Sequence, residues 1–406
     1  MRGVAKNTPR LRFPEFSGEW AEKDFHSFLA PDFRAVPKPT QNYLALGVRS
    51  HGKGTFHKPN SDPEKNAMDT LYEVHCDDLI VNITFAWEGA IAIAHADDHG
   101  GLVSHRFPTY RFDRSQVTSE YFEYVIEDRR IRQTLELISP GGAGRNRVLS
   151  KSAFLEIKHL FPQAEEQQKI AAFLGAVDAK IGQLTRKKAL LEDYKKGCMG
   201  QLFTQKLRFK DDQGNDFPDW EEKQLGEIAS FSKGKGISKS DIQPNGKNLC
   251  IRYGELYTQY REYIAKVASY TDTPTKRAVL SRKNDVLMPT SDVTPNGLAT
   301  ASAIDIEGVI LGGDILIIRS GEILNRFFAY YVAANKPKIM RLVTGVTVYH
   351  IYGSDLATLH LGIPHPDEQQ KIADFLFAID AKISLVADEL SAAQNFKKGL
   401  LQQMFV

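Results

Sequence analysis

Three glycine-rich segments carry the side chains in this sequence that best suit contact with a polyanion. Residues 51–58, 141–147 and 232–239 each combine glycine with lysine, arginine or histidine. Glycines let backbone N–H groups approach a ligand closely, and neighbouring cations favour phosphate. The three segments therefore predict contact with a nucleic-acid backbone. The alternative, that each one is a solvated turn, stays open.

Reading a base sequence needs hydrogen-bonding side chains that reach base edges. Arg145, Asn146 and Arg147 are the candidates in the first half of the chain, and positions 202 residues later carry Thr347, Val348 and Tyr349. The two halves thus predict different chemistry at one equivalent place. The residues predicted to contact DNA, with the lysines as phosphate contacts, are Arg49, Lys53, Lys58, Arg145, Asn146, Arg147, Lys233, Lys235, Lys239, Arg252, Thr347, Tyr349 and His350.

No catalytic motif in the sequence is complete. Pro-Pro is absent, so the Asn/Asp-Pro-Pro-aromatic loop of a DNA methyltransferase is missing. Residues 47–54 approach a P-loop, but glycine stands where the magnesium-binding hydroxyl belongs. The Glu-x-Lys pairs at 156–158 and 221–223 lack the further carboxylates of a metal nuclease. His95 and His99 lack a third metal ligand. The sequence predicts no catalytic residue, metal site or cofactor in this chain.

The chain is an internal repeat of two copies. Residues 166–181 and 368–383 are identical at 13 of 16 positions, and the offset of 202 continues to Phe203 and Phe405. A shorter match, Leu-Arg-Phe at 11–13 and 207–209, precedes each copy. Between these common segments the halves differ strongly. Two copies of one unit predict an internal pseudo-twofold arrangement, as in a dimer fused into one chain.

The common segments have the heptad spacing of a coiled-coil seam. Each predicted helix starts after a proline, Pro162 or Pro364, with acidic residues in its first turn. Gly197 and Gly399, each after two lysines, predict the helix ends, so each helix would have about 30 residues and span roughly 45 Å. An antiparallel pair is expected. The seam residues are Ile170, Leu174, Val177, Ile181, Leu184, Leu191, Ile372, Leu376, Ile379, Ile383, Val386 and Leu390.

The variable segments are predicted to contain more strand than helix. The expected strands cover residues 42–49, 90–94, 249–256, 309–311 and 314–318. The expected helices cover residues 119–136 and 324–341.

Composition fits a folded protein of two or three domains. The 406 residues carry a net charge of +2, which neither requires nor excludes nucleic acid. Three cysteines without a CxxC pair argue against a disulfide scaffold or a cysteine zinc site and fit a reducing cytoplasm. No signal peptide and no membrane span is expected.

The pattern resembles the specificity (S) subunit of type I restriction-modification systems. The segments that carry this resemblance are the twin Glu-Gln-Gln-Lys-Ile-Ala runs at 166–171 and 368–373 and the starting segments 11–20 and 207–228. The resemblance implies two target-recognition domains, each of which reads one half of a bipartite site in double-stranded DNA. It also implies two long helices that space these domains and dock two methyltransferase (M) subunits, with restriction (R) subunits joining the complex. S-adenosylmethionine, ATP and magnesium are then expected on the partners, and the S chain itself is not an enzyme.

We therefore expect an α+β protein of two globular recognition domains joined by two long antiparallel helices. The expected domains are 1–160 and 206–362 for recognition, with spacer helices at 161–205 and 363–406. One alternative is a coiled-coil scaffold without DNA specificity. Another is a stand-alone DNA methyltransferase or nuclease.

Overall fold

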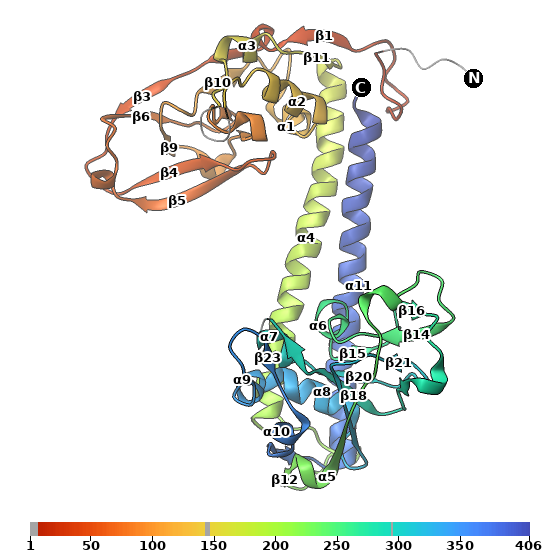
Figure 1. The fold of residues 1–406 in the computed structure, drawn as a ribbon. Helices are drawn as coiled ribbons and strands as arrows, with labels where there is room; N and C mark the ends of the chain where they lie inside the picture. The colour runs from red at the N-terminus through yellow and green to blue at the C-terminus, as the bar shows by residue number, and fades with distance from the viewer. Residues whose placement is uncertain (1–6, 143–146, 294) are drawn as a thin grey trace. The chain divides into compact units, whose positions relative to one another are not determined.

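The computed structural model describes residues 7–142, 147–293 and 295–406, and its contacts divide the chain into two compact units (Figure 1). Unit 1 contains residues up to Leu184 together with Glu389–Val406, and unit 2 contains Thr185–Asp388. Each unit therefore holds one variable segment plus parts of both long helices. The predicted boundaries treat the helices as separate segments, whereas by contacts each helix is shared between the two units.

Unit 1 combines two sheets, a strand pair and short helices. The strands are β1 (Ala21–Asp24), β2 (Leu29–Pro31), β3 (Arg34–Pro37), β4 (Tyr43–Val48), β5 (Thr55–Ser61), β6 (Thr70–Glu73), β7 (Leu79–Val81), β8 (Ile91–Ile93), β9 (Leu102–Val103), β10 (Thr109–Phe112) and β11 (Lys158–Phe161). The helices are α1 (Ser119–Val125), α2 (Arg129–Leu137), α3 (Lys151–Leu155) and the first part of α4 (Ala164–Phe203). The sheet orders are β2-β10-β7-β8 and β3-β6-β9-β4-β5, and β1 pairs with β11.

The core of unit 1 is aromatic. Phe25, Phe122 and Phe154 are fully buried, and the ring of Phe25 lies 5.2 Å from that of Phe122 and 5.4 Å from that of Phe154. Edge-to-face rings at such distances stabilise a core beyond the burial of their area. This core holds α1, β2 and β10 against the start of α4.

Unit 2 also combines two sheets with short helices, but it has two strand pairs instead of one. The strands are β12 (Glu221–Gln224), β13 (Ala229–Lys233), β14 (Asn248–Ile251), β15 (Tyr263–Ile264), β16 (Ser269–Thr271), β17 (Val279–Leu280), β18 (Asp285–Pro289), β19 (Ser291–Asp292), β20 (Ser302–Ile304), β21 (Ile310–Leu311), β22 (Ile315–Ser320), β23 (Tyr349–His350) and β24 (His360–Ile363). The helices are α5 (Leu225–Ile228), α6 (Glu255–Thr258), α7 (Pro295–Leu298), α8 (Asn325–Ala334), α9 (Lys336–Met340), α10 (Gly353–Ala357) and α11 (Pro366–Met404), whose last part belongs to unit 1. The sheet orders are β13-β22-β18-β20-β15 and β16-β14-β21-β17, and the pairs are β12-β24 and β19-β23.

The long helices α4 and α11 pack in opposite directions within each unit. In unit 1, Ile170 and Leu174 share a core with Leu400 and Met404, and Asp178 pairs with Lys397 at 2.9 Å. Residue numbers rise along α4 as they fall along α11, so the packing is antiparallel. Unit 2 repeats this: Leu202 shares its core with Ile372, and Lys195 pairs with Asp380 at 2.8 Å. The predicted α+β class with two long antiparallel helices is confirmed.

The predicted ends of the long helices are wrong. Helix α4 has 40 residues and runs through Gly197 to Phe203, and α11 has 39 residues and runs through Gly399 to Met404. The reason is tertiary packing, since buried apolar side chains follow each glycine: Met199 and Leu202 in α4, Leu400 and Met404 in α11. Their burial outweighs the loss of about 1 kcal/mol that a glycine causes inside a helix.

Most predicted strands and helices of the variable segments are present, with shorter bounds. Residues 42–49 contain β4 and residues 314–318 overlap β22. The predicted strand 249–256 is wrong in its second half, because β14 ends at Ile251 and α6 begins at Glu255. The predicted helix 119–136 is interrupted at Asp128, whose carboxylate accepts from Arg130 N and caps α2.

The repeated Glu-Gln pair at the start of each long helix fastens the variable segment to it. In unit 1, Arg12 Nε and Nη2 donate to Glu166 at 2.8 and 2.7 Å. Gln167 donates to Gln116 O and accepts from Thr118 N. We call this set joint 1, together with Trp20 and Pro162, whose carbonyl also accepts from Gln167 at 2.9 Å.

Unit 2 contains the equivalent joint 2. Arg208 donates to Glu368 at 3.1 and 2.8 Å, and Trp220 Nε1 donates to Glu368 at 3.0 Å. Gln369 donates to Glu322 O and accepts from Leu324 N. Glu166 and Glu368 are both almost fully buried. A buried carboxylate needs such partners because desolvation of a lone charge is costly, which explains why the pair recurs in both copies.

A second repeated set, which we call the latches, joins α4 to α11. In latch 1, Lys397 bridges Asp178 and Glu127, and Tyr124 Oη donates to Asp178 at 3.0 Å. Burial lowers the pKa of Lys397, but the bonds to the two carboxylates outweigh burial and leave this pKa raised. Latch 2 has Lys195 between Asp380 and Glu262, with Tyr330 Oη 2.6 Å from Asp380. Burial first, then Asp380, raises the pKa of Tyr330.

Among the described residues, no helix combines the length and apolarity that a bilayer crossing requires.

Candidate nucleic-acid interface

In unit 1, the β4–β5 hairpin brings three predicted phosphate or base contacts together. Arg49, Lys53 and Lys58 are all exposed. The ring of Phe56 lies 5.5 Å from the Arg49 guanidinium carbon and 5.4 Å from Lys58 Nζ. Arg49 also donates to the Thr55 carbonyl. The aromatic ring attracts both cations and gathers them on the hairpin.

Glycine at position 47 makes this arrangement possible. A Cβ on Gly47 would lie 2.3 Å from the Phe56 ring, so the ring rests directly on β4. The hairpin is fixed next to its turn by the buried carboxylate of Asp98, which accepts from Thr55 Oγ1 at 2.9 Å and lies 2.8 Å from His57 Nε2. Sequence reasoning missed Phe56 and Asp98, although the alternation Thr-Phe-His-Lys is a usable signal for a hairpin face.

The predicted base-reading run of unit 1 is only partly described. Arg145 and Asn146 lie outside the described residues. Arg147 donates to Ser139 O at 3.1 Å and to Glu136 O at 2.8 Å, and its guanidinium lies 5.0 Å from the Trp87 ring centroid. These contacts bind the Arg147 guanidinium to the end of α2 and to Trp87. The side chain is therefore engaged within unit 1 instead of being free to contact DNA.

In unit 2, Lys233 meets the aromatic groups of the predicted reading segment. Lys233 is the last residue of β13, and its ammonium lies 5.7 Å from the Tyr352 ring. Tyr352 stacks on His350 with ring centroids 6.0 Å apart. Lys235 and Lys239 are exposed and follow Lys233 along the chain. The structure thus brings Lys233 near His350, two residues that the sequence analysis selected separately.

Thr347 and Tyr349 belong to the same ribbon. Strand β23 pairs with β19, with Tyr349 opposite Asp292 and His350 opposite Ser291. Thr344 and His350 exchange both backbone hydrogen bonds, at 2.9 and 2.7 Å, which closes a hairpin around residues 345–349. Thr347 is exposed at its tip. We call residues 291–293 and 344–350 the ribbon.

Arg252 lies in another sheet, directly after β14. Its backbone N–H donates to the buried Glu255 carboxylate at 2.7 Å. Its Nε is buried and has no hydrogen-bond partner among the described residues. Arg252 therefore does not share the ribbon that holds the other candidates of unit 2.

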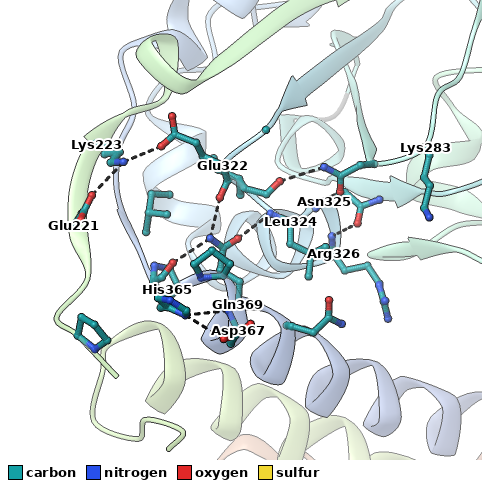
Figure 2. Close-up of a pocket in the computed structure, with 18 of the residues that line it drawn as sticks. Glu221, Lys223, Lys283, Glu322, Leu324, Asn325, Arg326, His365, Asp367 and Gln369 are labelled. Carbon is teal, nitrogen blue, oxygen red and sulfur yellow. Dashed lines mark hydrogen bonds and ion pairs between the residues drawn. The ribbon is translucent and has the colours of Figure 1, made fainter. Parts of the chain in front are cut away.

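Joint 2 borders the largest of the cavities described, about 1030 Å³, which Figure 2 shows. Lys223 Nζ bridges Glu322 at 2.8 Å and Glu221 at 3.1 Å on one side. Gln369, in the first turn of α11, also lines the cavity and donates to the backbone oxygen of Glu322. The lining mixes cations, carboxylates and amides, and no group of three metal-ligating side chains occurs there or elsewhere in the described parts of the chain. The cavity suits a polar protein surface better than a small apolar ligand.

Known proteins resemble this chain in sequence and in fold. Residues 218–394 match the family described as Type I restriction modification DNA specificity domain. A similar curated protein is the type I restriction enzyme MjaVIII specificity subunit of Methanocaldococcus jannaschii, 25% identical over 342 residues, 80% of this chain and 79% of the relative.

Two solved structures share the fold. The S subunit of a type I restriction-modification system from M. genitalium covers 98% of this chain and 99% of its own, with a TM-score of 0.62 and 15% identity. A chain from a structural study of complex assembly and conformational transition of the type I R-M system covers 95% of this chain and 97% of its own, with a TM-score of 0.53 and 15% identity.

The fold and the family match define a specificity protein built from two copies of one unit. Residues 218–394 contain a type I restriction modification DNA specificity domain, and the chain is similar over most of its length to type I restriction enzyme specificity subunits. This similarity implies recognition of a DNA sequence.

Proposed function

We propose that each unit of this chain reads one half of a bipartite site in double-stranded DNA and that the chain docks two methyltransferase subunits. The observation that carries the proposal is that the two joints are equal while the variable segments between the common segments, which we call the inserts, are unequal. Joint 1 and joint 2 use the same Arg-Glu pair and the same glutamine bonds. The inserts differ in strand order and in their exposed cations. Equal joints hold each insert in the same way on an equivalent helix start, which suits two copies of one partner, and unequal inserts suit two unlike half-sites.

The phosphate contacts are assigned to the exposed lysines Lys53, Lys58, Lys233, Lys235 and Lys239. Cations on a hairpin can follow the backbone of a duplex while the tip enters the major groove, which admits a two-stranded ribbon. The chemistry of modification and cleavage is assigned to partner subunits. These would hold S-adenosylmethionine, ATP and magnesium, and restriction subunits would join the complex of S and M chains.

The test is methylation by the purified complex. The S chain is co-purified with its M subunit, incubated with genomic DNA and S-adenosylmethionine, and the methylated bases are mapped by single-molecule sequencing. We expect one split motif with a fixed spacer, and no methylation by either chain alone. A pure scaffold would give methylation without any motif, and methyl transfer by the S chain alone would identify it as an enzyme. Either result would overturn the proposal.

A further inference from the structure

The ribbon of unit 2 carries Val346, the most exposed large apolar side chain among the described residues, and a second exposed valine, Val293. Val346 is 89% exposed and Val293 is 71% exposed. Valine side chains are normally buried, and a pair of them at a loop tip gains stability only when something covers it. Val348 and Tyr352, at 43% and 44%, extend the apolar surface along the same ribbon.

The backbone holds these valines in place. Gly345 has φ of +112°, and a Cβ there would lie 2.1 Å from the Val348 carbonyl, so the turn is tight and needs glycine. Extending the register of Asp292 with Tyr349 by one residue sets Val293 opposite Val348. The base of the ribbon is anchored by Ile351, which is fully buried. The tip is therefore a built feature that presents valine outward.

The charge around the tip fits DNA. Residues 341–353 contain Arg341 and His350 and no carboxylate. Lys233 lies over Tyr352, beside the ribbon. A two-stranded ribbon is narrow enough for the major groove, where the only apolar group on the base edges is the 5-methyl of thymine. The ribbon itself contains no Lys or Arg, and its one carboxylate, Asp292, is buried. Its apolar tip, with Lys233 and Arg341 as the neighbouring cations, is complementary to that methyl group close to the phosphates.

We propose that Val346 contacts thymine 5-methyl groups in the half-site that unit 2 reads, with Val293 and Val348 as the neighbouring apolar pair of the ribbon. The inference rests on the proposed function and adds to it the base that unit 2 selects. It predicts at least one A·T pair in that half-site, recognised by shape and apolar contact. Unit 1, with Arg49 and Lys58 on its hairpin, has no such valine pair at the β4–β5 turn.

The experiment is a double-mutant cycle. One change removes the methyl group from a thymine of the DNA, and the other removes the valine side chain from the protein. Once the motif is mapped, each thymine of either strand is replaced by deoxyuridine, and affinity is measured for the complex of S and M chains. One buried methyl contributes about 0.8 kcal/mol, so the wild-type complex should lose about fourfold at one position of the second half-site. The variant Val346→Ala should bind roughly tenfold more weakly and lose its sensitivity to deoxyuridine at that position.

Controls separate the outcomes. Deoxyuridine in the first half-site should leave the Val346→Ala cycle unchanged, and Val346→Thr, which keeps the shape, should resemble Val346→Ala. A second half-site without thymine on either strand, no methyl effect, or an equal methyl effect in Val346→Ala would each overturn the proposal. Loss of M-subunit assembly in Val346→Ala would overturn it in favour of a protein contact. Failure of the proposed function differs from all of these, because the wild-type complex would then show no motif.

Discussion

Joint 1 and joint 2 perform the same task with one difference in bonding. In joint 2, Glu368 accepts from Arg208 and from the Trp220 indole at 3.0 Å. In joint 1, Glu166 accepts from Arg12, but the buried Trp20 Nε1 has no hydrogen-bond partner among the described residues. The ion pair is therefore the part that both joints share, whereas the indole bond is an addition that one copy lacks.

Removing the carboxylate of a joint should have the largest effect on stability. Glu368→Ala leaves a guanidinium and an indole without their acceptor, and breaking a buried pair costs about 3–5 kcal/mol. Glu166→Ala should cost about 1 kcal/mol less, since it strands no indole. Hydrogen–deuterium exchange of β12 and β24 compared with β1 and β11 reports each joint separately. Equal exchange in the two variants would show that the indole bond contributes nothing.

Breaking a latch should have the second-largest effect on stability. Lys195→Met leaves Asp380 and Glu262 facing each other without a cation, and Lys397→Met does the same to Asp178 and Glu127. Both lysines keep some solvent access, so we expect a loss of about 2 kcal/mol in each unit. The double variant Lys195→Met/Asp380→Asn should recover part of the loss. If it is as unstable as the sum of the single variants, the lysine and the aspartate are not coupled.

One position in the paired strands gives the two units different pH dependence. His159 in β11 stands opposite Lys23, and its counterpart in β24, Leu361, stands opposite Lys223. Burial lowers the pKa of His159 to about 4. Below pH 6.5 the unfolded chain therefore binds a proton that the folded chain excludes, and stability falls as the pH falls toward 4.

The substitution His159→Leu copies the second unit into the first. It should abolish this acid sensitivity, a difference of about 2 kcal/mol in the free energy of unfolding at pH 5, and should change little at pH 8. Denaturant unfolding at both pH values measures it. An unchanged loss of stability between pH 8 and pH 5 would show that another group carries the proton.

The smallest effect is expected for single cations in unit 1. Lys53 and Arg147 are compared, because the sequence predicts a DNA contact for both. Lys53 is exposed on the hairpin, whereas Arg147 is bound to the end of α2. Lys53→Ala should leave stability unchanged and reduce the salt dependence of DNA binding by about one ion. Arg147→Ala should weaken α2 with little change in that slope. The reverse pattern would exchange their roles.

Much of this architecture follows from the sequence, because a repeat of 202 residues reveals equivalence without any structure. The seam of α4 and α11 and the starts of both helices could be predicted from heptad spacing, proline and acidic residues. The helix ends could not, since burial of Met199 and Leu400 overrides the glycine signal. The partners of Arg147, and the exposure of Val346, depend on contacts between segments distant in the chain or on a turn whose geometry the sequence does not display.

The most direct test of the central claim, that each unit reads its half-site independently, is a domain exchange. Residues 24–158 are replaced by the corresponding insert of a relative with a known motif, which leaves Arg12, Glu166 and the long helices α4 and α11 in place, while the donor supplies the counterparts of Tyr124 and Glu127. The methylated motif of the chimera is then mapped with the same M subunits. The account predicts that one half-site changes to that of the donor while the other half-site stays as it was. A change in both half-sites, or in neither, would contradict it.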